Sequence, residues 1–128
     1  MNPNQQRGLK VRTEVMGQDF VDQAMNQGDA FTQPMQDLIN EHCWGSTWQR
    51  DDLSRDTRSL VTVAMLVALK APQELKGHIR GALRNGCTVE QIRAVILHSA
   101  VYCGAPAAQE AQEALRAAKE VIDNSVNE

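Results

Sequence analysis

Glu74 and His78 are the two residues whose types and separation best suit acid–base chemistry. A separation of four places both side chains on one face of a helix. There a carboxylate can fix the tautomer of the imidazole and raise its proton affinity. A histidine held in this way can act as a general acid or base near neutral pH. The same spacing also occurs on solvent-exposed helix faces, so a purely structural alternative stays open.

Two further histidines, His42 and His98, add to the titratable groups of the chain. His98 lies in the apolar segment VILHSAVYCG, where a histidine is usually a hydrogen-bonded core residue. Three histidines together with Glu41 and Glu74 could bind a metal ion, but neither HxxxH nor HExxH spacing is present. We therefore expect no metal site.

Arginines lie near these candidates, notably Arg58 and, on the histidine helix, Arg80. A guanidinium presents a planar fork of donors that matches a carboxylate. In an acidic protein, arginines beside an apolar pocket suggest an anionic small molecule. For Arg50 and Arg55, ion pairs with neighbouring aspartates explain the charge equally well.

The tryptophans and cysteines are sparse. Trp44 and Trp48 are four residues apart, which suits closure of a cavity or an interface as well as packing in a core. Cys43, Cys87 and Cys103 are widely spaced, without a CxxC pair. We expect free thiols in a reducing compartment, acting as small apolar residues rather than nucleophiles.

Helices must position all of these residues, because no segment has the alternating pattern of a strand. The expected fold is all-α, a compact bundle of five to six helices in one domain over residues 1–128, with 1–6 a flexible terminus. The periodicity and the Gly, Pro and capping residues predict helices over about 7–26, 33–45, 57–70, 72–85, 89–104 and 107–122.

Four local signals support these boundaries. Thr32 is the expected N-cap of the second helix, and Gly45 is expected to end it in a left-handed conformation. Asn85 and Gly86 end the histidine helix, and Thr88 with Gln91 forms a capping box for the next one.

The two central apolar segments, SLVTVAMLVAL and AVILHSAVYCGAPAA, predict an oligomer. The first is apolar on nearly every side, which is typical of a helix buried all round. A chain of 128 residues leaves much of its surface exposed, so both segments cannot be covered by their own chain. Burial against other subunits is the simplest solution, and we expect a homo-oligomer.

Composition excludes several partner classes. Apolar residues make up 42% of the chain and charged residues 23%, which is typical of a packed soluble domain. The net charge is −3 and no basic block interleaves with aromatics, so we expect no nucleic-acid partner. The polar first ten residues and the absence of an 18-residue apolar run lead us to expect no membrane association and a cytoplasmic location.

The segments EHCWGSTWQRDDLSRDTRSLVTVAMLVAL, HIRGALRNGCTVEQIR and VYCGAPAA together resemble the carboxymuconolactone decarboxylase family. The resemblance covers roughly residues 20–122 in the order and spacing of the family. It implies an alkylhydroperoxidase D-like helical fold assembled into a ring, commonly a hexamer. It also implies cofactor-free decarboxylation of 4-carboxymuconolactone to 3-oxoadipate enol-lactone and CO2 in protocatechuate breakdown, the β-ketoadipate pathway.

The resemblance to the family also frames a mechanism. Loss of CO2 moves electrons onto the lactone carbonyl, so the substrate serves as its own electron sink. We expect His78, oriented by Glu74, to protonate the resulting carbon and Arg58 or Arg80 to hold the substrate carboxylate. We expect the remaining members of the substrate site to be Trp44, Trp48, Tyr102, His98 and Glu41.

Three alternatives stay open: a decarboxylase or lyase for a different lactone, a thiol-dependent peroxidase on the same scaffold, and a non-catalytic module that binds a small ligand. The peroxidase is disfavoured because Ala71 and Glu74 occupy the positions of its two cysteines. Ser59 stands at the position of its acid on the preceding helix.

Overall fold

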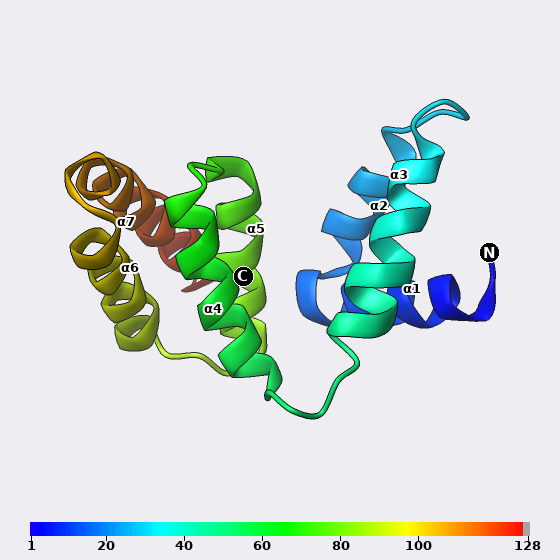
Figure 1. The fold of residues 1–128 in the computed structure, drawn as a ribbon, viewed down its shortest axis with the longest axis horizontal. Coiled ribbons are helices and arrows are strands. Elements are labelled where there is room, and N and C mark those ends of the chain that lie inside the picture. The colour runs from blue at the N-terminus through cyan, green and yellow to red at the C-terminus, as the bar shows by residue number, and fades with distance from the viewer. Residues whose placement is uncertain (127–128) are drawn as a thin grey trace. The chain divides into compact units, whose positions relative to one another are not determined.

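A computed structural model describes residues 1–126, which contain seven α-helices, one π-helical segment and no strand (Figure 1). The predicted all-α class is confirmed, whereas the number of helices exceeds the five to six predicted. The chain forms two compact units, Met1–Ser54 and Arg55–Glu128, which are described separately below.

The first unit begins with α1 (Pro3–Met16), which starts inside the terminus that we expected to be flexible. A capping box explains this start. The side chain of Asn2 accepts a hydrogen bond from the backbone N–H of Gln5, and the side chain of Gln5 accepts one from the backbone N–H of Asn2.

Gly17 divides the first predicted helix in two. Its φ of 91° is unfavourable for residues with a side chain, so α1 ends there and α2 (Gln18–Asn26) begins. This one residue accounts for part of the larger helix count.

The short helix α3 (Gln33–Leu38) continues directly into a π-helical segment, η1 (Ile39–Thr47). The helical segment ends at Thr47, within the predicted WGSTW segment, but Gly45 does not take the predicted left-handed conformation because η1 runs through it. A Cβ atom at Gly45 would lie 2.4 Å from the carbonyl oxygen of Asn4, and one at Gly8 would lie 1.7 Å from that of Asn40. These glycines are therefore needed for the close approach of α1 to η1.

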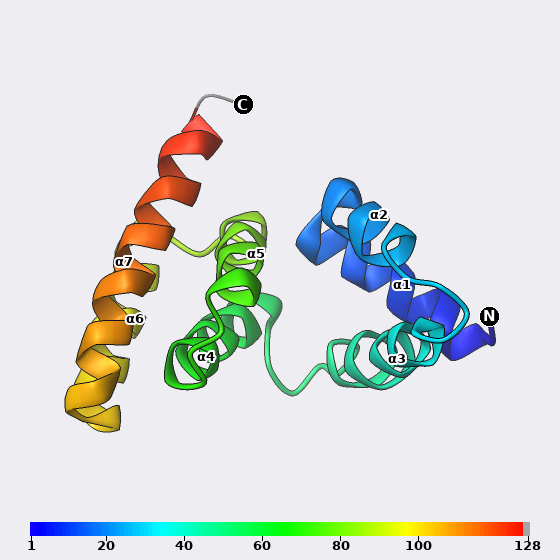
Figure 2. The ribbon, with the colours of Figure 1, turned by 90° about the horizontal axis from the view of Figure 1, so that it is seen from above.

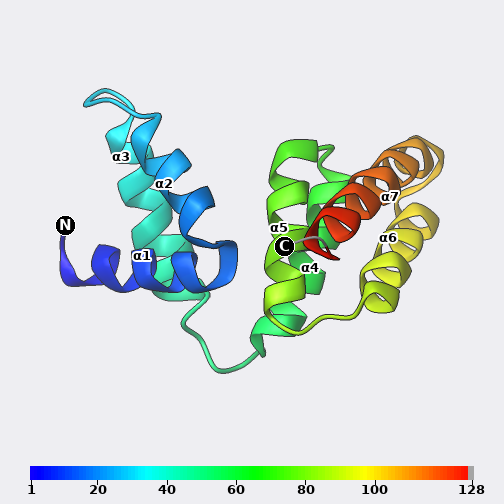
Figure 3. The ribbon, with the colours of Figure 1, turned by 180° about the vertical axis from the view of Figure 1, so that it is seen from behind.

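The second unit contains four helices: α4 (Arg55–Ala68), α5 (Pro72–Arg84), α6 (Val89–Cys103) and α7 (Ala105–Val126). The predicted capping box of Thr88 and Gln91 is present at the start of α6. Gly86, with a φ of 92°, lies in the turn after α5 as predicted. Figure 2 shows α6 and α7 packed side by side, and Figure 3 shows α4 beside α5.

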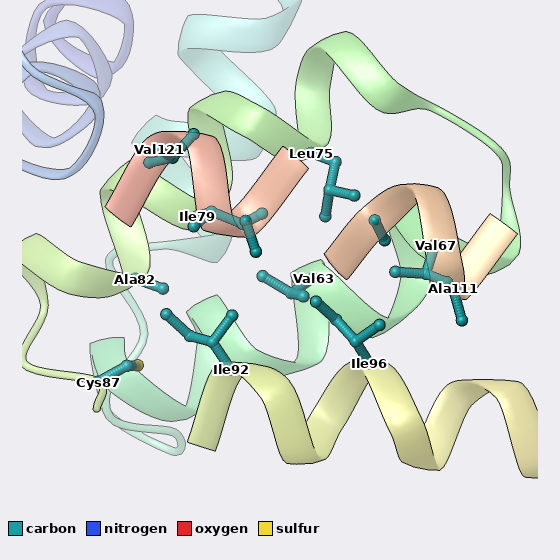
Figure 4. Close-up of a cluster of buried hydrophobic side chains, with 12 residues drawn as sticks. Val63, Val67, Leu75, Ile79, Ala82, Cys87, Ile92, Ile96, Ala111 and Val121 are labelled. Carbon is teal, nitrogen blue, oxygen red and sulfur yellow. The ribbon is translucent and has the colours of Figure 1, made fainter. Parts of the chain in front are cut away.

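Side chains from all four helices meet in the core of the second unit (Figure 4). Val63 and Val67 from α4 face Ile79 from α5 and Ile96 from α6. Most of these residues are aliphatic, as expected for a chain with few aromatic residues. The α7 helix contributes mainly small side chains, which lets it approach the other three helices closely.

The helix α4 is buried on one side only. Ser59, Val63 and Val67 are buried, whereas Met65 and Leu69 are 58% and 73% exposed. Within the single chain, α4 is therefore covered on one face only, and the predicted all-round burial would require other subunits. Among residues 1–126, no helix is both long enough and apolar enough to cross a lipid bilayer.

Candidate active site

His78 lies on α5 at the edge of the core of the second unit. Leu75 and Ala82, one turn before and one turn after it, are buried in that core. The histidine is half-buried and its Nδ1 atom is buried. This position holds the ring by packing while leaving part of it accessible, which suits a proton donor.

Glu74 does not orient this ring in the structure. It lies one turn before His78, as predicted, but it is exposed. Within the part of the chain that the structure describes, its carboxylate forms no hydrogen bond or ion pair. The packing of α5, and not the carboxylate, therefore limits the motion of His78.

Arg58 lies in the first turn of α4, beside the end of α5. The hydroxyl of the adjacent Ser59 accepts a hydrogen bond of 2.9 Å from the side-chain amide of Asn85. His78 is seven residues earlier on α5, which corresponds to about 10 Å along the helix axis. Arg58 is half-buried, with its Nε atom buried.

Arg80 lies on the other side of α5 from His78. Two residues along an α-helix correspond to a rotation of about 200°. Arg80 is exposed and borders a hollow between α5 and α7. The structure therefore favours Arg58 over Arg80 as the partner of His78.

His98 and Tyr102 form a pair on α6, with ring centroids 4.8 Å apart. His98 is exposed and lines a shallow groove of about 390 Å³ between α4 and α6, and Tyr102 is 80% exposed. The expected hydrogen-bonded core position of His98 is therefore wrong for the single chain. Tyr102 does not enclose a pocket formed by the second unit alone.

Glu41, Trp44 and Trp48 belong to the first unit. The two indole rings stack with centroids 4.8 Å apart and are buried among Val11, Val15 and Met16. The two tryptophans therefore pack in the core of this unit, which is one of the alternatives that their spacing left open. The carboxylate of Glu41 accepts a 3.4 Å hydrogen bond from the side-chain amide of Asn2.

Arg12 is a buried cation that the sequence analysis did not single out. It is 6% exposed, and its Nη1 atom donates hydrogen bonds to Gln36 (2.9 Å) and Asn40 (3.0 Å). Desolvation lowers its pKa, although the nearby Cys43 has the opposite effect. The only local signal was an arginine next to the apolar positions Val11 and Val15.

Cys43 and Cys87 are poor nucleophiles in this structure. Desolvation raises the pKa of Cys43, although the charge of Arg12 and a hydrogen bond from Trp48 oppose this effect. Burial also raises the pKa of Cys87, and the carboxylate of Asp56 adds to the shift. Both groups are therefore thiols at neutral pH, and a thiolate is the reactive form.

Metal-binding groups do not converge in the described chain. Among residues 1–126, no group of three or more His, Cys, Asp or Glu side chains is placed to hold a metal ion. The chemistry argued below accordingly uses protein side chains only.

The described residues form an all-helical protein with a histidine at the edge of a helical core. Comparison with known proteins identifies its family. The model of the Carboxymuconolactone decarboxylase family matches residues 33–120, about two thirds of the chain. The chain therefore belongs to the carboxymuconolactone decarboxylase family, which confirms the resemblance seen in its sequence.

Two of the similar proteins are named for different substrates. The chain is 47% identical over 104 residues to nitrosuccinic acid decarboxylase npaB of Metarhizium robertsii, covering 81% of this chain and 73% of that protein. It is 42% identical over 113 residues to the 4-carboxymuconolactone decarboxylase of Acinetobacter baylyi, covering 87% and 84%. Peroxisomal protein 2 of Saccharomyces cerevisiae is 37% identical over 67 residues, covering 49% and 24%.

Proposed function

We propose that this protein is a cofactor-free carboxy-lyase that acts on a small dicarboxylic or tricarboxylic acid. The observation that carries the proposal is the family match over residues 33–120, together with two decarboxylases among the relatives. The preferred substrate is 4-carboxymuconolactone, and its products would be 3-oxoadipate enol-lactone and CO2. This reaction would place the protein in protocatechuate breakdown.

Nitrosuccinic acid is the second candidate substrate, because the relative named for it has the higher identity, 47% against 42%. The two acids can lose CO2 by the same route. In each, the carbon that loses CO2 is attached to an electron acceptor: directly to the nitro group in one acid, and through the ring C=C bond to the lactone carbonyl in the other. The carbon–carboxyl bond breaks, its electron pair moves onto the acceptor oxygen, and a proton then adds to carbon.

His78 is the proposed donor of that proton. A positioned general acid of this kind contributes about 10²–10⁴ to the rate. Glu74 has no direct part in this scheme, because its carboxylate forms no hydrogen bond or ion pair among the described residues.

Arg58 is the proposed anchor for a substrate carboxylate that is retained. A guanidinium binds a carboxylate through charge-assisted hydrogen bonds, which are about twice as strong as neutral ones.

The decisive experiment supplies each acid in turn and measures CO2 release and product mass. We expect turnover of at least one of the two acids by the wild-type protein. Failure to release CO2 from either acid would contradict the proposal, and turnover of nitrosuccinic acid alone would identify the second candidate as the substrate.

His78→Ala tests the proton donor. We expect kcat/KM for the substrate to fall at least about tenfold while the circular dichroism spectrum is unchanged. His42→Ala, at an exposed histidine of the first unit, is the matched control and should retain activity. A smaller loss in His78→Ala would assign the proton to another group.

A further inference from the structure

A polar hollow lies on the face of α5 that points away from His78. Its volume is about 190 Å³, and it is bounded by α5 and the last turns of α7. The residues that line it are Arg80, Leu83, Arg84, Val121, Asn124 and Ser125. This volume equals that of about six water molecules in the liquid, so the hollow can hold a small molecule and not a nucleotide.

Two arginines give this hollow a positive charge. Arg80 and Arg84 are four residues apart, so they share a helix face, where like charges disfavour each other. The position of Arg84 in the last turn is explained by its interaction with the helix dipole, but that of Arg80, one turn earlier, is not. Within residues 1–126, Arg80 forms no hydrogen bond and no ion pair.

The acidic residues nearest to the hollow on α7 are engaged by lysines. Glu120 forms an ion pair of 3.4 Å with Lys76, and Asp123 forms one of 2.7 Å with Lys119. Asp123 and Lys119 both line a different groove, between α6 and α7. Among the described residues, neither of these carboxylates forms an ion pair or hydrogen bond with Arg80.

Asn124 adds a neutral donor to the same hollow, because its side-chain amide carries two N–H groups. The hydroxyl of Ser125 donates to the backbone carbonyl of Ile122 at 2.7 Å, so it offers only lone pairs. A guanidinium and an amide facing one another across a small hollow match the acceptor oxygens of an oxyanion.

We propose that this hollow is a second anion site, in which Arg80 and Asn124 bind a small oxyanion such as a dicarboxylate or phosphate. It is separate from the site around His78, because the two lie on opposite faces of α5. The proposal does not depend on the identity of the reaction, because it concerns binding alone.

Calorimetric titration of the full chain tests this site. Inorganic phosphate and succinate serve as separate probes at constant ionic strength, so the two titrations distinguish a phosphate from a dicarboxylate ligand. We expect saturable binding of at least one probe, with one equivalent per chain. Arg80→Gln should weaken this binding at least about tenfold, because it removes charge-assisted hydrogen bonds.

Two control variants separate a built site from general charge effects. Arg93→Gln removes the same charge from the exposed surface of α6, in the other groove, and should change the affinity less than about twofold. His78→Ala should bind the probe like the wild type even where it has lost decarboxylation. The proposal is overturned if neither probe binds saturably, if Arg80→Gln and Arg93→Gln behave alike, or if His78→Ala abolishes binding.

Discussion

At the residue scale, the buried side chains of Ser59 and Cys87 in the second unit each have a hydrogen-bond partner. Ser59 accepts from Asn85, and the thiol of Cys87 donates to the backbone carbonyl of Asp56 at 3.3 Å. Both bonds tie the start of α4 to the turn that follows α5. They hold Arg58 in place relative to His78, so packing and hydrogen bonds, not a catalytic carboxylate, define the candidate site.

The raised pKa of Cys87 predicts how the free energy of unfolding depends on pH. Its pKa in the folded state lies above the ordinary value of 9.0, so the folded protein holds the proton more tightly than the unfolded chain. The corresponding stability is fully present below about pH 9 and is lost as the pH rises through the raised pKa. Urea unfolding at pH 7 to 10.5 should show this decline.

Cys87→Ala should make the decline in the free energy of unfolding less steep, because the titrating group is removed. Cys103→Ala, at an exposed thiol, is the control and should leave the slope unchanged. An equal slope in wild-type protein and Cys87→Ala would show that Cys87 is not held as a thiol by the fold.

At the scale of elements, the first unit depends on the close contact of α1 with η1. Gly8 and Gly45 permit that contact, and Arg12 on α1 ties it to Asn40 at the start of η1. The π-helical geometry of η1 widens the helix where Trp44 enters the core. Such segments interrupt ordinary helical periodicity, so the sequence pattern predicted a shorter helix that ends at Gly45.

Gly8→Ala provides the test of this contact. In an exposed helix, alanine is more favourable than glycine by about 1 kcal/mol. At Gly8 the new methyl group would meet a backbone carbonyl, so we expect the free energy of unfolding to fall by about 2–4 kcal/mol. Chemical denaturation measures the change.

Lys10→Ala, on the exposed side of the same helix, should alter stability by less than about 0.5 kcal/mol. A more stable protein after Gly8→Ala would mean that α1 and η1 do not approach as closely as the structure places them.

At the scale of the whole molecule, the second unit leaves an apolar surface on α4 and α6. Its members are Val61, Met65, Leu69, Leu97, Val101 and Tyr102, each at least 40% exposed. A surface of this kind usually marks an interface. We propose that a second copy of the chain covers it within a homo-oligomer, for which the family resemblance suggests a hexamer.

Met65→Glu combined with Val101→Glu should disrupt this assembly, because it places charges on an apolar interface. Sedimentation at micromolar concentration should show an oligomer for the wild type and a smaller species for the double variant. Leu53→Glu, at an exposed apolar residue outside α4 and α6, should sediment like the wild type. A monomeric wild type would contradict the proposal.

Much of the second unit could be predicted because its signals are local. Pro72 at the start of α5, Gly86 in the turn after it and the capping box at Thr88 each act within a few residues of the chain. The all-α class followed directly from these patterns.

The family was also determined by the sequence alone, and with it the candidate acid His78. Spacing did not decide whether Glu74 contacts the ring, because side chains four residues apart can meet or turn outwards. Nor did it show that Arg80 faces away from His78 into a separate hollow, or that Arg12 is buried. Those features depend on contacts between helices far apart in the chain, and only the tertiary structure fixes which face of each helix is covered.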